Sequence, residues 1–170
     1  MSNKITFKKS YIGIPTSAWK VILGFTLFRL FLALILPLTP QEAYYWSWSR
    51  DLALSYFDHP PLASYSIWFT TLIFGQTIFG IKLAAVLWYL GMNIIWATII
   101  QEMFDNSRQT FWTLLALNAS IVFELYGFVI TPDTPLLFCW TATIYALWKL
   151  VQSKHPQWWY VAGLFMGLAW

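Results

Sequence analysis

Residues 81–101 read IKLAAVLWYLGMNIIWATIIQ, and this run decides the fold class of the chain. It carries a single basic residue, Lys82, at its start. A helix rises 1.5 Å per residue, so about 20 consecutive apolar residues suffice to cross the hydrocarbon core of a bilayer. We therefore expect a membrane-spanning helix here.

The composition of the whole chain agrees with a membrane protein. Of its 170 residues, 59% are hydrophobic, 21% are aromatic and only 10% are charged. A soluble domain carries about 25% charged residues, and disordered chains are polar, so both of these classes are excluded. The net charge of +3 is too small and too scattered for nucleic-acid binding. A single cysteine, Cys139, excludes an internal disulfide.

Further apolar runs predict an all-α integral membrane protein, a multi-span helical bundle. The expected spans are 21–38, 81–101, 111–129, 135–151 and a truncated one at 158–170. The last run has only about 13 residues when the sequence stops, whereas a spanning helix needs about 20. We therefore interpret residues 21–170 as the N-terminal part of a larger transmembrane domain; a short complete protein is the alternative.

The segment 62–79 decides the topology, because it is apolar but diluted by polar residues. If it lies at the interface without crossing, the basic residues divide unevenly between the two sides. One side then holds Lys4, Lys8, Lys9, Lys20, Arg108, Lys149 and Lys154, and the other holds Arg50 and Lys82. The positive-inside rule favours this arrangement over the nearly even division that a crossing would give. It predicts a cytoplasmic segment 1–20 and an extracytoplasmic loop 39–80 with amphipathic interfacial helices.

The loop begins with Thr39, Pro40, Gln41 and Glu42, which fit the start of a helix. In a capping box, a threonine at the N-cap and a glutamate three residues later satisfy each other's backbone N–H groups. A structural role for Glu42 is therefore one interpretation. The aromatic residues that follow suit a helix at headgroup level, and the same rings could stack on a sugar. These are Tyr44, Tyr45, Trp46 and Trp48.

Two short motifs add acidic groups to the same side of the membrane. In YFDHPP at 56–61, two prolines prevent a helix from continuing through Asp58 and His59. This pair suits a metal, a phosphate or a solvated turn, and a metal site needs further ligands. In TPDTP at 131–135, Asp133 occupies the first turn of an expected helix, where the helix dipole favours a negative charge.

Two ionisable residues lie within expected spans. Arg29 and Glu124 both fall roughly 10–14 Å below the same extracytoplasmic face. A charge in a bilayer is costly unless it is paired, so we expect an Arg29–Glu124 ion pair with a structural role. Lys82 either extends its ammonium group to the interface or holds an anionic lipid phosphate.

The order of these motifs resembles a known family. The strings QEAYYW at 41–46, YFDHPP at 56–61 and TPDTPL at 131–136 resemble polytopic GT-C glycosyltransferases. More narrowly, they resemble the bacterial relatives of dolichyl-phosphate-mannose-protein mannosyltransferases and lipid A aminoarabinose transferases. The resemblance covers the whole chain but only about the N-terminal third of such enzymes. It implies transfer of a sugar from a polyprenyl-phosphate donor to a lipid, glycan or protein acceptor, at the extracytoplasmic face of the plasma (inner) membrane.

The resemblance also implies roles for single residues. The family usually carries an Asp-Glu pair in its first extracytoplasmic loop, with the aspartate as the catalytic base, and here the pair is Gln41-Glu42. An amide is not a useful base, so the resemblance assigns the base role to Glu42 and substrate hydrogen bonding to Gln41.

The other matching positions concern the donor. Asp58 and His59 correspond to a loop motif near the donor phosphate or a bound divalent cation, so the resemblance allows either no cofactor or a cation at these two residues. Asp58 is thereby a second catalytic candidate. Lys82 would neutralise donor phosphate, and Asp133 would orient the loop. Tyr45 and Trp46 would contact substrate.

Two other classes of function stay open. The chain could be a catalytically inactive or truncated membrane scaffold of the same fold, because the first acid of the pair is missing. It could also be a transporter or lipid flippase, since Arg29 and Glu124 lie within spans; no internal repeat supports this. The expected partners are the lipid-linked donor, an unidentified acceptor and membrane lipids, without nucleic acid.

Overall fold

The structure is a computed structural model that describes residues 13–169, and these residues form helices without a strand. This confirms the predicted all-α bundle. The helices are α1 (Thr16–Ile35), α2 (Pro40–Ser49), α3 (Leu62–Phe74), α4 (Ile78–Phe104), α5 (Ser107–Ala119), α6 (Ile121–Tyr126), α7 (Asp133–Ser153) and α8 (Gln157–Leu168). Lys4, Lys8 and Lys9 of the expected cytoplasmic segment lie outside the described residues, as does Trp170.

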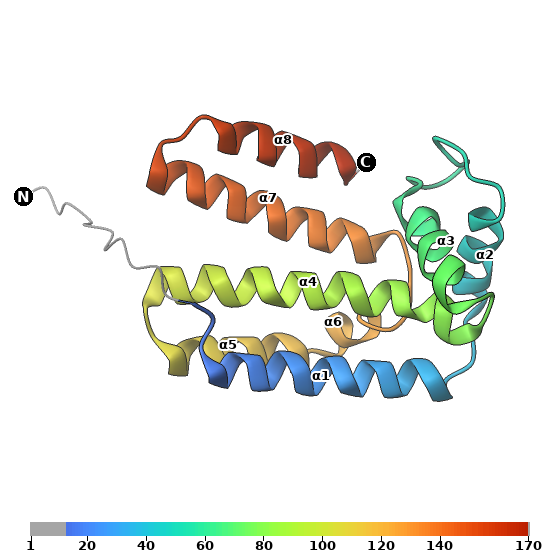
Figure 1. Cartoon of the computed structure of the whole chain (residues 1–170), viewed down its shortest axis with the longest axis horizontal. Helices are drawn as coiled ribbons and strands as arrows, with labels where there is room; N and C mark the ends of the chain where they lie inside the picture. Colours follow the sequence, from blue (N-terminus) through green and yellow to red (C-terminus); the bar gives the residue numbers. More distant parts are fainter. Residues whose placement is uncertain (1–12, 170) are drawn as a thin grey trace, which may run out of the picture.

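The long helices run back and forth between two ends of the molecule (Figure 1). Helix α4, with 27 residues, lies at the centre and packs against α1, α5 and α7, and α8 packs against α7. Three of the described helices, α1, α4 and α7, are long and apolar enough to cross a membrane. Helices α2 and α3 stand together at one end, beside the turn that leads into α7 (Figure 1).

The expected spans differ in detail from these helices. Residues 111–129 belong to two helices, because the backbone at Ser120 is extended, with φ −72° and ψ 121°, and separates α5 from α6. Helix α8 has 12 residues. The number of helices that cross a membrane stays a prediction.

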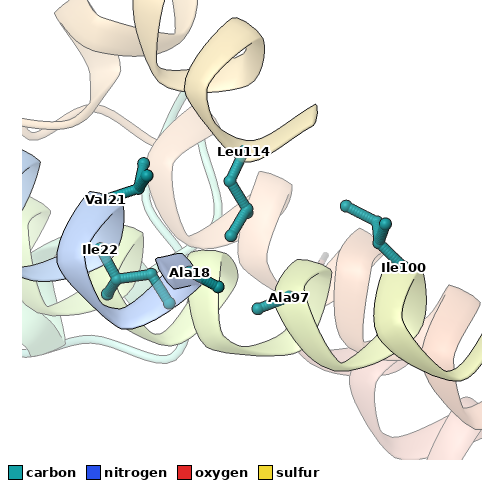
Figure 2. Packing of buried hydrophobic residues seen from close by; sticks show 6 residues of the cluster. All are labelled: Ala18, Val21, Ile22, Ala97, Ile100 and Leu114. Atoms are coloured by element: carbon teal, nitrogen blue, oxygen red, sulfur yellow. The ribbon is translucent and has the colours of Figure 1, made fainter. Parts of the chain in front are cut away.

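A buried hydrophobic cluster joins the first turns of α1 to the last turns of α4 and to α5. Ala18, Val21 and Ile22 of α1 meet Ala97 and Ile100 of α4 and Leu114 of α5 (Figure 2). Alanine at a helix contact lets two backbones approach closely, which strengthens packing where lipid removes the hydrophobic driving force. This cluster fixes α1, α4 and α5 relative to one another.

A second buried cluster attaches α2 and α3 to α4. It consists of Tyr45, Ile67, Ile81, Ala84, Ala85 and Ile130. Helix α3 has 13 residues and is roughly 20 Å long, too short to cross a bilayer. A tight corner at Gly75, where φ is +76°, then turns the chain into α4. Such a φ is accessible to glycine without a steric penalty.

Candidate functional site

The residues predicted to form the site gather at one end of the bundle, which we call the loop end. It comprises α2, α3, the connection 50–61, the first turns of α4 and the segment 127–132 that leads into α7 (Figure 1). Asp58 and His59 lie in the connection, Asp133 begins α7 and Lys82 lies in the second turn of α4. The structure therefore brings together motifs that are far apart in the sequence.

Glu42 closes the N-terminus of α2. Its Oε2 accepts hydrogen bonds from the Thr39 backbone N–H at 2.9 Å and from the Thr39 hydroxyl at 3.1 Å. In return, Thr39 Oγ1 accepts from the Glu42 backbone N–H at 3.2 Å. The predicted capping box is confirmed.

The same carboxylate forms a buried ion pair with Lys82. Lys82 Nζ lies 2.7 Å from Glu42 Oε2 and 2.9 Å from Oε1, and the exposed fractions of the two side chains are 1% and 0%. The Ile130 backbone N–H also donates to Glu42 Oε1, at 3.4 Å. Glu42 therefore joins α2, α4 and the segment 127–132 at one point, and its catalytic role stays a prediction. The predicted contact of Lys82 with donor phosphate also stays a prediction, and in this structure its ammonium group is paired with Glu42.

Two carboxylates that the sequence predicted for the site reach the surface of the loop end. Asp58 and Asp133 are both exposed. The Tyr44 hydroxyl donates to Asp58 Oδ2 at 3.0 Å. Desolvation raises the pKa of Tyr44, and this hydrogen bond raises it further, so the phenol remains a donor at neutral pH.

Tyr45 is buried, and its hydroxyl lies close enough to both acids for their charges to act on it. Burial raises the pKa of its hydroxyl, a hydrogen bond with Gln41 lowers it, and the negative charges of Asp133 and Asp58 raise it again. Both carboxylates thus act on one phenol. The His59 ring meets the Tyr45 ring edge-on, with centroids 5.8 Å apart. The exposed part of the site therefore contains Gln41, Asp58, His59 and Asp133, and the buried Tyr45 ring lies beneath them.

Trp46 points in a different direction from Tyr45, because successive residues of a helix are rotated by about 100°. Its indole N–H donates to Gln76 Oε1 at 2.6 Å, beside the corner between α3 and α4. The guanidinium of Arg50 lies over its ring, 5.7 Å from the centroid. The two aromatic residues that were predicted together as substrate contacts occupy different sides of α2.

Tyr56 holds the connection 50–61 in place, a role that the sequence did not indicate. Its ring stacks on Trp48 at 4.4 Å and an angle of 8°. Its hydroxyl lies 2.9 Å from the Trp48 carbonyl oxygen and 3.0 Å from that of Asp51. A second tyrosine, Tyr65 of α3, donates to the Ala53 carbonyl oxygen at 2.9 Å. These anchors position Asp58 without regular secondary structure.

Metal ligands are few at the loop end. Within residues 13–169 no group of three or more histidine, cysteine, aspartate or glutamate side chains is placed to hold a metal ion. Asp58 and His59 supply only two ligand side chains, and a zinc or calcium site built by protein residues uses more than two.

Arg29 and Glu124 form the expected ion pair. Arg29 Nη2 lies 2.7 Å from Glu124 Oε2 and also donates to Asn118 Oδ1 at 2.7 Å. The guanidinium lies 4.7 Å from the centroid of the Tyr89 ring. Asn118 in turn donates to Asn93 Oδ1 at 2.6 Å. The pair thus belongs to a polar network that joins α1, α4, α5 and α6.

Comparison with known proteins adds family information to this geometry. The family model for dolichyl-phosphate-mannose-protein mannosyltransferase matches residues 58–170, a range that begins at Asp58. A relative, the lipid A galacturonosyltransferase RgtD of Rhizobium johnstonii, is 29% identical over 164 residues. This match covers 91% of the chain but 33% of the relative, so the chain spans about a third of that protein's length. No solved structure matches the chain.

Proposed function

The chain belongs to the dolichyl-phosphate-mannose-protein mannosyltransferase family, and from this premise we propose that it transfers a sugar from a polyprenyl-phosphate donor to an acceptor. The reaction takes place at the loop end, on the extracytoplasmic face of the plasma membrane. The observation that carries the proposal is that three exposed groups, Asp58, His59 and Asp133, gather at the loop end beside the buried Tyr45.

The chemistry needs one base and a stabilised leaving group. A carboxylate takes the proton from the acceptor hydroxyl as its oxygen bonds to the anomeric carbon of the sugar. The bond between that carbon and the phosphate oxygen breaks at the same time, and polyprenyl phosphate leaves with the electron pair. Donor N–H groups near the phosphate stabilise its charge.

We assign the base role to Asp58 rather than to Glu42. Asp58 is exposed, and the hydrogen bond from Tyr44 fixes its Oδ2 while Oδ1 remains available to an acceptor. Glu42 is fully buried, and both of its oxygens accept hydrogen bonds. Glu42 and Lys82 are instead positioning residues that hold the loop end together. His59, next to Asp58, donates a ring N–H to the donor phosphate.

The relative's name suggests which substrates to test first. RgtD is a lipid A galacturonosyltransferase. A lipid A-type glycolipid is therefore the first acceptor for this chain, and polyprenyl-phosphate galacturonate is the first donor beside neutral hexose and pentose donors.

The test is transfer of labelled sugar by membranes that contain the protein, with Asp58→Asn as the variant. A general base contributes about 10²- to 10⁴-fold to the rate, so we expect kcat to fall at least 100-fold. Asp51→Asn is the matched control, because Asp51 is an exposed carboxylate of the same connection and its side chain has no assigned role. Full activity of Asp58→Asn would refute the base assignment. Inactivity of the unchanged protein with every donor would favour the membrane scaffold.

The same assay separates the two functions open to Asp58 and His59. If the pair holds a divalent cation together with the donor phosphate, EDTA abolishes transfer and Mg²⁺ restores it. If Asp58 is the base, transfer survives EDTA.

A further inference from the structure

We propose that a pocket on the opposite side of α2 binds the phosphate group of an anionic membrane lipid. The pocket has a volume of about 550 Å³ and is lined by Trp46, Ser49, Arg50, Trp68 and Gln76. None of these lining residues belongs to the candidate site that contains Gln41, Tyr45, Asp58, His59 and Asp133. The proposal stands independently of sugar transfer.

Charge is the first argument for an anion. Arg50 is the one charged residue in the lining, and no carboxylate of the described residues lies within ion-pair distance of its guanidinium. Helix α3 has no charged residue, and neither does the corner that follows it. The nearest acid along the chain is the exposed Asp51. A guanidinium matches the geometry of a phosphate with two parallel N–H groups.

Two polar groups of the lining, the Arg50 guanidinium and the Gln76 amide, can donate hydrogen bonds to a ligand. Gln76 Oε1 already accepts the indole N–H of Trp46, so its amide NH₂ group remains to donate. The Ser49 hydroxyl donates to the Trp46 carbonyl oxygen at 2.6 Å and thereby holds the C-terminal turn of α2. The Arg50 guanidinium lies over the Trp46 ring, which restrains it at the edge of the pocket. Arg50 and Gln76 therefore offer N–H groups to the same space.

The surroundings of the pocket favour a lipid over a free anion. One face of α3 is apolar and exposed, with exposed fractions between 42% and 66% for Trp68, Phe69, Leu72, Ile73 and Phe74. Trp68 belongs both to this face and to the pocket. Tryptophan is enriched where headgroups meet acyl chains. A ligand with a phosphate at Arg50 and an acyl chain along α3 would satisfy both surfaces.

The experiment is a titration of the full chain in detergent, read by native mass spectrometry. The probes are phosphatidylglycerol, phosphatidylcholine and inorganic phosphate. We expect one tightly bound phosphatidylglycerol, and phosphatidylcholine at least tenfold weaker. Arg50→Gln should weaken phosphatidylglycerol binding at least tenfold, equivalent to about 1.4 kcal/mol. The matched control is Arg108→Gln, which removes the same charge from an exposed position in the first turn of α5. This variant should bind normally.

The other outcomes are equally decisive. Unchanged binding by Arg50→Gln, or equal binding of both lipids, would overturn the proposal. Inorganic phosphate should compete only weakly, and equal affinity for phosphate alone would show that the lipid chain takes no part. If Arg50→Gln unfolds, Arg50→Lys keeps the charge but loses the paired N–H geometry, and it should weaken binding several-fold with an unchanged melting temperature. The proposal would be overturned if a folded Arg50→Lys variant bound phosphatidylglycerol as tightly as the unchanged protein and bound phosphatidylcholine equally well.

Discussion

At the scale of single residues, burial decides what an ionisable group can do. Glu42 and Asp58 are both acids of the same loop end, but one is fully buried against Lys82 and the other is exposed. Removing two charges from water costs several kcal/mol per ion, and only complete pairing offsets this. Glu42 meets that condition through Lys82, Thr39 and the Ile130 N–H. This burial is the reason that we propose a structural role for Glu42, although its motif is typical of a catalytic acid.

Breaking this buried pair should strongly destabilise the protein. We expect Lys82→Met to lower the free energy of unfolding by about 3–5 kcal/mol, because it leaves the Glu42 carboxylate buried without its cation. Denaturant unfolding in detergent, followed by tryptophan fluorescence, measures the loss.

Two controls distinguish the loss of stability caused by breaking the buried ion pair from the loss caused by removing a lysine side chain. The double variant Glu42→Leu with Lys82→Met should recover part of the stability, since no charge is left buried. Lys149→Met breaks a more exposed pair with Glu102, also at 2.7 Å but with exposed fractions of 26% and 16%, and should cost about 1 kcal/mol or less. Equal losses for Lys82→Met and Lys149→Met would contradict the argument.

The Arg29 network depends on the absence of a side chain at Gly127. A Cβ atom added there would overlap Arg29 Nε and lie 2.9 Å from Arg29 Cδ. We expect Gly127→Ala to destabilise by about 1–3 kcal/mol, because the guanidinium must move away from Glu124. Gly163→Ala is the control, since a Cβ at Gly163 meets no atom within 4 Å. A lower melting temperature for Gly163→Ala than for Gly127→Ala would refute this explanation.

At the scale of elements, hydrogen bonds from side chains position the parts that lack helical structure. The connection 50–61 carries Asp58 and His59, and Tyr56 and Tyr65 fix it to backbone carbonyl oxygens. Helix α2 divides its aromatic residues between two surfaces, with Tyr45 toward His59 and Trp46 toward Gln76. The same short helix therefore serves the proposed sugar-transfer site and the proposed lipid site.

Removing the hydroxyl of Tyr56 tests the role of the connection. Tyr56→Phe keeps the stacking on Trp48 but loses the hydroxyl contacts with the Trp48 and Asp51 carbonyl oxygens. We expect kcat for sugar transfer to fall about tenfold, because a displaced reactive group costs rate more than stability. Tyr160→Phe, at a position 81% exposed, should leave kcat unchanged. An unchanged kcat for Tyr56→Phe would show that the connection does not position Asp58.

At the scale of the whole molecule, the order of the helices places the three sequence motifs together at the loop end. The connections after α1, α3 and α6 lie at the loop end, and those after α4 and α7 lie at the opposite end (Figure 1). Large apolar side chains remain exposed along the helices, including Leu27, Phe31, Trp140 and Leu164. Such a surface suits lipid or further helices rather than water.

Cysteine labelling can establish which end faces the cytoplasm. Cys139 is 1% exposed, so Cys139→Ser provides a background without a reactive thiol. In intact cells, a membrane-impermeant maleimide should label Ser55→Cys in the connection 50–61. It should label Arg108→Cys, at the other end, only after permeabilisation, because the basic residues near that end are expected in the cytoplasm. The reverse pattern would invert the topology and the location of the proposed activity.

The sequence predicted most of the residues that gather at the site, but it predicted less well which charged side chains pair with each other. The Arg29–Glu124 pair follows from the sequence because few charges lie in the apolar runs and a charge in a bilayer needs a partner. The Glu42–Lys82 pair does not, since several acids were available to Lys82 at the same end. The break at Ser120 and the Asn93–Asn118 hydrogen bond were also missed, because neither a proline nor a glycine marks the break.

The sequence by itself determined the all-α membrane class, the capping box at Thr39 and Glu42, and the family. Each rests on local information: hydropathy, helix-end chemistry and motif order are set by neighbours along the chain. The tertiary structure alone decided that Glu42 is buried and Asp58 exposed, and that Trp46 and Arg50 share a pocket with Gln76. Burial and pairing depend on which distant segments meet, and that depends on how the helices pack.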